Sequence, residues 1–132
     1  MKRNEERKTV FYLVFEKCFR DESCEEILSI AQEVSEFKIT DYISSTFCGV
    51  INNLSEIDGI ISPCLSNWSI NRLPKTTLSI LRLAVFEMKF NDEIPVSVAI
   101  DQAVEIAKEY SDEKDAVYIN GVLGTIAREC DK

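Results

Sequence analysis

The strongest hydrophobic pattern in the chain lies in residues 77–90, TLSILRLAVFEMKF. Apolar residues recur there at the i, i+3, i+4, i+7 spacing of one helical face: Leu78, Leu81, Ala84, Val85 and Met88. Others cover the remaining sides: Ile80, Leu83, Phe86 and Phe90. A helix that is apolar almost all round is normally surrounded by other helices. The segment is shorter than the roughly 20 residues that a membrane span needs. We therefore expect a central core helix.

Helical spacing also predicts two amphipathic helices before this core segment. The first covers residues 4–20 and has a wide apolar stripe, so it should pack on two sides. The second covers residues 24–37. Four of its apolar residues are expected to face inward: Ile27, Ile30, Ala31 and Val34.

A third apolar series covers residues 40–66. Either Thr40 or Asp41 can cap it, because each side chain can accept a backbone N–H bond. Gly59 weakens a helix, so we expect a bend or short break over residues 55–59.

The connector before the core helix contains the only tryptophan of the chain, Trp68, which we expect to dock onto the core. Pro74 and Pro95 can open the two following helices, since proline is tolerated at the first helical position. Ser111 is the expected N-cap of the last helix. Gly121 interrupts the good helical pattern of this last helix. A glycine at such a position indicates a close approach of two helices.

These elements predict an all-α bundle of six or seven helices joined by short loops. The 132 residues are most simply one domain, with an N-terminal helical half over 1–66 and a C-terminal half over 74–132. Only four glycines and three prolines argue against a turn-rich β sandwich or barrel.

Cysteine and histidine usage narrows the chemistry. The five cysteines contain no CxxC pair, and the chain has no histidine. Small buried thiols are therefore a better interpretation than a zinc site, and no metal ligand is predicted. The missing histidine also removes Ser-His and Cys-His pairs and the commonest general base. No catalytic residue and no cofactor are predicted.

The start of the chain, MKRNEERK, is charged and is not followed by an uninterrupted apolar signal region. No apolar run reaches membrane length. We therefore expect a cytoplasmic protein that makes no contact with a membrane.

The net charge of −8 is unevenly distributed. Residues 1–20 carry six basic and three acidic side chains, a balance of +3, which leaves −11 for the rest. A basic end on an acidic body suits a polyanion at that end and a separate partner surface elsewhere. The simpler alternative is a solvated first helix turn.

Three consecutive segments resemble a known family. They read ILRLAVFEM over 80–88, IPVSVAIDQAVEIAKEY over 94–110 and YINGVLGTIA over 118–127. They are similar to the ILR-hydrophobic-E, P-x-x-V-A-I-x-E-A-V-E-L-A-K and F-V-N-G-V-L-x-x-I-A motifs of the NusB family of bacterial transcription antitermination factors. The N-terminal K-R…R-K-x-x-x-x-L-x-F pattern matches more loosely. Residues 21–66 agree in pattern only.

The resemblance implies a NusB-like fold of two small helical subdomains without enzymatic activity. Members of the family bind the single-stranded boxA element of ribosomal RNA leaders and form a heterodimer with NusE, the ribosomal protein S-ten. That complex joins the elongating RNA polymerase and suppresses premature termination. The expected partners are therefore boxA-type RNA, NusE and the RNA polymerase antitermination complex. Whether the free chain forms a homodimer is left open.

The resemblance also assigns RNA-binding residues, beginning with a basic arm. Lys2, Arg3 and Arg7 would contact RNA phosphates, and charge alone adds Lys8. Such contacts give salt-dependent affinity without reading sequence. Glu5 and a neighbouring glutamate interrupt the arm, so we expect weak RNA binding by the chain alone.

A second group of expected RNA-binding residues flanks the turn into the last helix. Tyr110 and Tyr118 fall at aromatic positions of the family, where unstacked bases can stack. Lys114 and Asp115 lie between them and could bond to base edges. Without the resemblance, Tyr110 would be a core residue, Tyr118 would only pack, and the two charged residues would be a solvated helix start.

Two further positions complete the expected sites. Arg82 is the arginine of the ILR motif, a candidate partner of a phosphate or of a buried carboxylate such as Glu87. Phe15 lies near the side of the family that faces NusE, although its apolar face also fits a core position.

Two other functions remain open at this point. One is an acidic helical protein–protein adaptor without RNA binding, which the net charge favours. The other is the RNA-binding module of an rRNA cytosine methyltransferase. That enzyme would need a following α/β domain with a glycine-rich cofactor loop, and the chain contains no GxGxxG motif.

Overall fold

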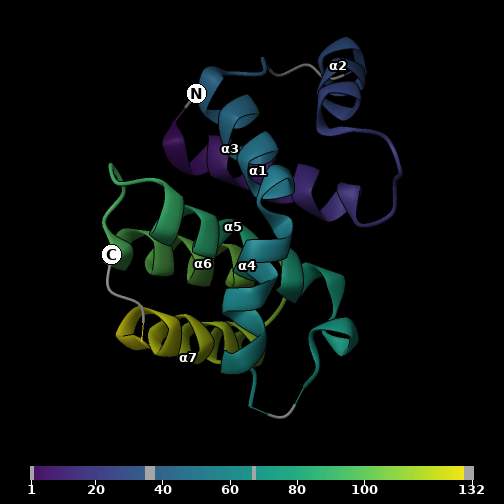
Figure 1. The fold of residues 1–132 in the computed structure, drawn as a ribbon. Helices are drawn as coiled ribbons and strands as arrows, with labels where there is room; N and C mark the ends of the chain where they lie inside the picture. Colours follow the sequence, from purple (N-terminus) through teal and green to yellow (C-terminus); the bar gives the residue numbers. More distant parts are fainter. Residues whose placement is uncertain (1, 35–37, 67, 130–132) are drawn as a thin grey trace.

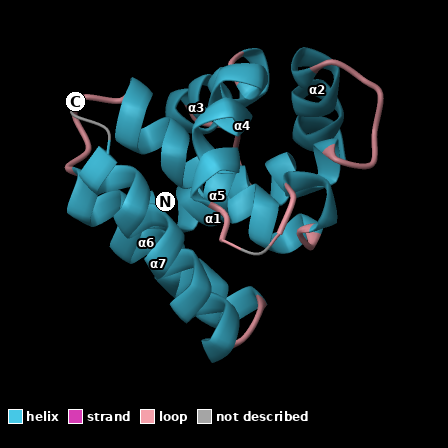
Figure 2. Ribbon diagram, turned by 60° about the horizontal axis from the view of Figure 1, so that its bottom comes forward, coloured by secondary structure: helices cyan, strands magenta, loops and turns pink. Residues whose placement is uncertain are grey.

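The computed structural model describes residues 2–34, 38–66 and 68–129 (Figure 1). In that part of the chain there are seven α-helices and two short 3-10 helices. Their bounds are α1 Arg3–Lys17, α2 Cys24–Val34, α3 Asp41–Asn52, α4 Leu54–Ile61, η1 Ser62–Cys64, η2 Ile70–Arg72, α5 Lys75–Phe90, α6 Val96–Tyr110 and α7 Glu113–Glu129. Figure 2 shows helices and loops only, so the all-α prediction is confirmed. The division into halves over 1–66 and 74–132 stays a prediction.

Helix α5 is the centre of the bundle. It packs against five other helices, α1, α3, α4, α6 and α7. In Figure 1, α5 and α6 form a middle layer, with α7 on one side and α1 and α3 on the other, while α2 stands apart beside α3. The prediction of a central core helix is confirmed, because seven of the nine apolar side chains of α5 are buried, while Phe86 is half-buried and Phe90 is exposed. Burying one such side chain contributes roughly 1.5–3 kcal/mol.

A buried polar network joins three helices around α5. Glu87 of α5 is 1% exposed, and its Oε1 accepts a hydrogen bond from Nε of Arg7 in α1 at 2.7 Å. Its Oε2 accepts one from the hydroxyl of Tyr42 in α3 at 2.6 Å. Burial opposes the charge of Arg7, but the hydrogen bond and charge of Glu87 outweigh it, so the pKa of Arg7 is raised. Burial and the same carboxylate raise the pKa of Tyr42.

Two helix boundaries differ from the sequence prediction because side chains compete for backbone groups. The expected break over 55–59 lies earlier, at Asn53, where Nδ2 donates to the carbonyl oxygen of Gly49 at 2.8 Å. The last helix is capped by Asp112 in place of Ser111, since Oδ1 of Asp112 accepts from the backbone N–H of Asp115 at 2.7 Å. The predicted cap at Thr40 is confirmed.

Several residues expected in the core lie on the surface. On α2, Ile27 is fully buried, whereas Ile30 is 37% and Val34 76% exposed. Trp68 is 52% exposed. Periodicity identifies an apolar face but does not say what covers it. Helix α2 packs mainly on α1 and α3. The predicted end of this helix at residues 35–37 lies outside the described residues.

The close helix approach expected at Gly121 occurs instead at Gly49. A Cβ built on Gly121 would meet nothing within 4 Å, whereas one on Gly49 would lie 2.4 Å from the ring of Phe86. The absence of a side chain at Gly49 therefore lets α3 pack against α5.

We predict that Arg7→Met lowers the free energy of unfolding by about 3 kcal/mol, because it leaves the buried carboxylate of Glu87 without its charged partner. Lys8→Met is the matched control. It breaks an ion pair with Glu109 at the surface and should change stability far less than Arg7→Met does. Urea unfolding of both variants checks this, and equal losses would contradict the structural role of Arg7.

Candidate nucleic-acid and protein interface

The first residues of the chain present two accessible cations. Lys2 is exposed, and the Arg3 side chain is 55% exposed. The Arg3 guanidinium carbon lies 4.0 Å from the centroid of the Tyr42 ring, and its Nε donates to Oε1 of Glu6 at 3.3 Å. The remaining Oε2 of Glu6 accepts from the hydroxyl of Thr40. The Arg3 side chain is thus oriented by α3 while keeping an outer face available to a phosphate.

Arg7 does not belong to this accessible arm. It is 4% exposed, and its Nε is engaged by Glu87. The prediction that Arg7 contacts an RNA phosphate is therefore wrong for this structure. The side chain lies inside the bundle because helical spacing turns it toward α5, away from the faces of Lys2 and Lys8.

Lys8 lies in a groove between α1 and α6. Its Nζ is 2.8 Å from Oε2 of Glu109, and this hydrogen bond raises the pKa of Lys8. The groove has a volume of about 360 Å³ and is lined by Asn4, Lys8, Gln102, Glu105, Ile106, Lys108 and Glu109. A phosphate entering it would compete with Glu109 for the lysine. The groove is therefore suited to weak, salt-sensitive contacts.

Tyr110 is the last residue of α6 and follows Glu109, which lines this groove. Its ring is 51% exposed and packs on Phe11 with centroids 5.2 Å apart. The core interpretation of Tyr110 is therefore wrong, since half of the side chain faces solvent. An exposed ring supported from behind offers a stacking surface to an unpaired base.

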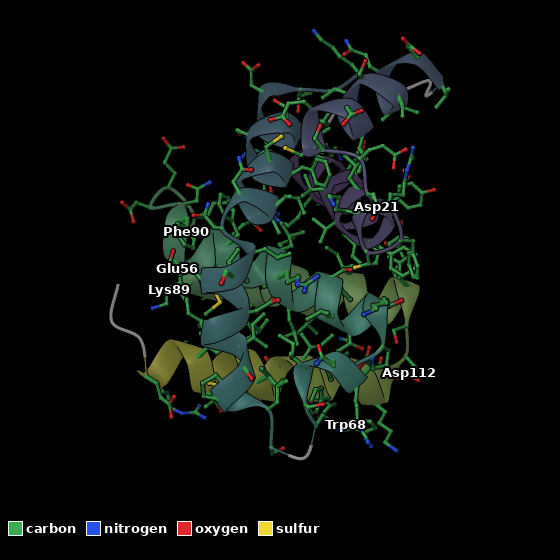
Figure 3. The ribbon with its side chains drawn as sticks, turned by 45° about the vertical axis from the view of Figure 1, so that its right-hand side comes forward. Asp21, Glu56, Trp68, Lys89, Phe90 and Asp112 are labelled. Atoms are coloured by element: carbon green, nitrogen blue, oxygen red, sulfur yellow. The ribbon has the colours of Figure 1, made fainter. Side chains whose placement is uncertain are left out.

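A second pocket lies beyond the turn that follows Tyr110. Its volume is about 380 Å³. It is lined by Trp68, Leu73, Pro74, Thr76, Thr77, Ser111, Asp112, Lys114, Asp115 and Tyr118. Figure 3 shows Trp68 and Asp112 at the same edge of the molecule. Sequence analysis missed Trp68 as a site residue because a lone tryptophan usually packs.

The hydroxyl of Tyr118 is buried and has no hydrogen-bond partner within the described part of the chain. Burial, followed by the charge of Asp115, raises the pKa of Tyr118, so the phenol stays protonated. A buried donor without an acceptor is rare in proteins. This hydroxyl can donate to a group that enters the pocket.

The charged residues of the turn differ from each other in their environment. Lys114 is exposed at the pocket rim. Asp115 accepts a hydrogen bond from the hydroxyl of Thr77, at 3.0 Å to Oδ1 and 2.9 Å to Oδ2. This bond fixes the start of α7 against α5. Lys114 is thus accessible to RNA, whereas the Asp115 carboxylate is already used for structure.

Arg82 has a carboxylate partner, but this partner is Asp58 of α4 and not Glu87. Two parallel bonds join them, from Nε to Oδ1 at 2.9 Å and from Nη2 to Oδ2 at 2.8 Å. A bidentate pair of this kind occupies the Nε–Nη2 edge of the guanidinium. Of the two alternatives for Arg82, the structure therefore favours the carboxylate over the phosphate.

Phe15 is half-buried in a row of aromatic rings along α1. Its centroid lies 6.4 Å from that of Phe11 and 5.2 Å from that of Phe19. Phe19 is 65% exposed, and Tyr12, which lies three positions before Phe15 and so on the same side of α1, is 59% exposed. The row therefore ends in an exposed apolar patch, formed by Tyr12, Phe15 and Phe19, that suits a protein partner. Sequence analysis singled out only Phe15.

No helix in the described part of the chain is both long and apolar enough to cross a membrane.

Comparison with known proteins agrees with this arrangement. A protein-family model described as the NusB family matches residues 4–128 of the chain. The chain is 42% identical over 129 residues to transcription antitermination protein NusB of Listeria monocytogenes serotype 4a, with 98% of each covered. It is 39% identical over 138 residues to the protein of the same name from Clostridium botulinum strain Loch Maree, covering 94% of this chain and 98% of that one.

Solved structures give the same result. A structure described as T. maritima NusB superposes with a TM-score of 0.86 at 40% identity, over 98% of this chain and 92% of that chain. A second one is described as antitermination factors NusB and NusE in complex with dsRNA. It has a TM-score of 0.85 at 28% identity, over 98% of this chain and 100% of that chain. The chain belongs to the NusB family.

Proposed function

We propose that this chain is a transcription antitermination factor that binds boxA-type RNA together with NusE and joins the elongating RNA polymerase complex. The observation that carries the proposal is a series of RNA-compatible features that follow one another along α1, α6 and the turn into α7. The series begins with the accessible arm, formed by Lys2 and Arg3. It continues with Tyr110 and the groove between α1 and α6, and it ends with the pocket lined by Trp68 and Tyr118. The name shared by the relatives supports this role.

The arm supplies affinity that depends on ionic strength. Lys2 and Arg3 can each neutralise one phosphate, and each such contact releases condensed counterions. The net charge of −8 and the glutamates beside the arm oppose the approach of a polyanion. The chain alone therefore binds RNA weakly.

The pocket supplies affinity for unpaired bases. A base stacked on an exposed aromatic ring such as that of Trp68 gains about 1–3 kcal/mol. The Tyr118 hydroxyl can then donate to an acceptor on the base edge. Bases in a duplex cannot enter such a pocket, so it favours single-stranded RNA.

The apolar patch of Tyr12, Phe15 and Phe19 would hold NusE. Because the aromatic row runs from Tyr110 to Phe19, a partner on the patch lies next to the RNA-binding features. Two weak surfaces linked in this way raise the apparent affinity of the complex. The mechanism needs binding only, without a catalytic step, and acts on nascent RNA in the cytoplasm.

The direct test is a fluorescence-anisotropy titration of boxA RNA into the chain alone and into the chain with NusE. We expect weak binding by the chain alone and at least about tenfold tighter binding with NusE. A duplex of the same sequence should bind less tightly. No detectable binding at low salt with NusE present would instead support the acidic protein–protein adaptor.

For the arm, the double variant Lys2→Gln/Arg3→Gln should lower the slope of log K against log salt by about 1.4, since each phosphate contact on a single strand contributes about 0.7. Lys17→Gln/Arg20→Gln removes the same charges from the other end of α1, roughly 20 Å away. This control should leave the slope unchanged. Equal effects of the two variants would mean that only net charge matters.

For the pocket, Tyr118→Phe should weaken RNA binding about fivefold, because a net hydrogen bond contributes about 1 kcal/mol. The same substitution removes a buried hydroxyl without a partner, so it should not destabilise the free chain. Val117→Ala is the control, since Val117 is 70% exposed beside it. Unchanged affinity of Tyr118→Phe would exclude the hydroxyl from the site.

A further inference from the structure

Two cysteines and a glutamate meet where α2 begins beside α3. Cys24 is the first residue of α2 and is 3% exposed, and Glu25 follows it at the surface. Cys48 lies half-buried in α3. The two Sγ atoms and a carboxylate oxygen all lie within 4.8 Å of one another. The two thiols are not joined in a disulfide.

A capping box fixes the backbone at this point. The Ser23 hydroxyl accepts from the backbone N–H of Glu26 at 3.1 Å, and Oε1 of Glu26 accepts from the backbone N–H of Ser23 at 3.1 Å. The cap uses the carboxylate of Glu26, and the carboxylate of Glu25 lies beside the thiols. A bond from its own backbone N–H, and then one from the Cys24 thiol, lower the pKa of Glu25, so its carboxylate is ionised.

We propose that Cys24, Glu25 and Cys48 form a binding site for a thiophilic divalent cation such as Zn²⁺. Two sulfurs and one oxygen are a donor set that zinc prefers. With bonds of about 2.3 Å to sulfur and about 2.1 Å to oxygen, the donors of a tetrahedral zinc ion lie about 3.6–3.8 Å apart. The donor atoms, which lie within 4.8 Å of one another, would need to approach by about 1.2 Å or less. A water molecule would take the fourth position.

Charge and proton balance favour a doubly charged ion. Burial, and then the neighbouring Cys48 and Glu25, raise the pKa of Cys24 to about 12, so the Cys24 thiol is protonated in the absence of a cation. Binding converts two thiols to thiolates and releases their two protons to solvent. The cation then neutralises two of the three negative charges. Affinity should therefore increase as pH rises.

The site would secure a weakly held helix. Apart from Cys24 and Ile27, the residues of α2 are not buried, and α2 stands away from α5, α6 and α7 in Figure 1. A cation shared by Cys24 and Cys48 would join the first turn of α2 to the middle of α3. Sequence analysis found no zinc site because the two thiols are separated by 24 positions and lie on different helices.

The test is a titration of Zn²⁺ and Co²⁺ into the full reduced chain without RNA, so its outcome is independent of the proposed function. We expect one ion per chain, a thiolate-to-cobalt charge-transfer band with the spectrum of tetrahedral Co²⁺, and tighter binding as pH rises from about 6 to 8. Hydrogen exchange of the α2 amides should slow when the ion binds.

Variants assign the ligands. Cys24→Ala/Cys48→Ala should abolish binding, and Glu25→Gln, at the surface, should weaken it at least about tenfold without affecting the fold. The matched control replaces the other three cysteines with alanine: Cys18, Cys64 and Cys130. Cys64 is an apt comparison, because its Sγ also lies near a carboxylate, 3.7 Å from Oε2 of Glu129. The control should keep full affinity.

Three results would overturn the proposal. The first is that the reduced chain shows no saturable binding. This result overturns the proposal even if oxidation joins Cys24 and Cys48 in a disulfide. The second is binding that survives in the Cys24→Ala/Cys48→Ala variant. The third is loss of binding in the triple control, which would place the ion elsewhere.

Discussion

The structure depends on one buried carboxylate, Glu87, at the centre of the bundle. A carboxylate that is 1% exposed is stable only when charged and hydrogen-bonding partners surround it. Arg7 and Tyr42 supply these partners from α1 and α3. Because each partner can reach Glu87 in only a narrow range of positions, the network sets how α1 and α3 lie on α5. It therefore also sets where the arm at the start of α1 points.

This constraint links the core to the binding surface. With Arg7 turned inward, helical geometry turns Lys8 toward α6 and leaves Lys2 exposed. Arg3 then rests on the ring of Tyr42, the residue that also bonds to Glu87. On the other side of the bundle, Asp115 accepts a hydrogen bond from the hydroxyl of Thr77, and this bond holds the start of α7 beside α5. Arg3 and the start of α7 are thus placed by polar contacts, whereas Tyr110 is placed by its packing on Phe11.

The sequence predicted what local spacing controls. The all-round apolar α5 and the cap at Thr40 are set by neighbours within a few positions. It could not predict which basic residue of α1 is buried, because the partner that stabilises Arg7 in the core is a carboxylate 80 positions away. The surface position of Trp68 and the meeting of Cys24 with Cys48 likewise depend on tertiary packing. The motifs identified the family, but they assigned Arg3 and Arg7 the same role. The two residues differ in burial, which the motifs do not show.

The most direct test of this account is the salt dependence of boxA-RNA binding by the double variant Arg7→Met/Glu87→Leu. This variant removes the buried pair together and replaces it with apolar side chains of similar size, so the fold can be retained. If Arg7 contacts no phosphate, and the apolar pair keeps α1 packed on α5, the slope of log K against log salt should equal that of the unmodified chain. A slope lower by about 0.7, in a variant that remains folded, would show that Arg7 contacts a phosphate and would contradict the account.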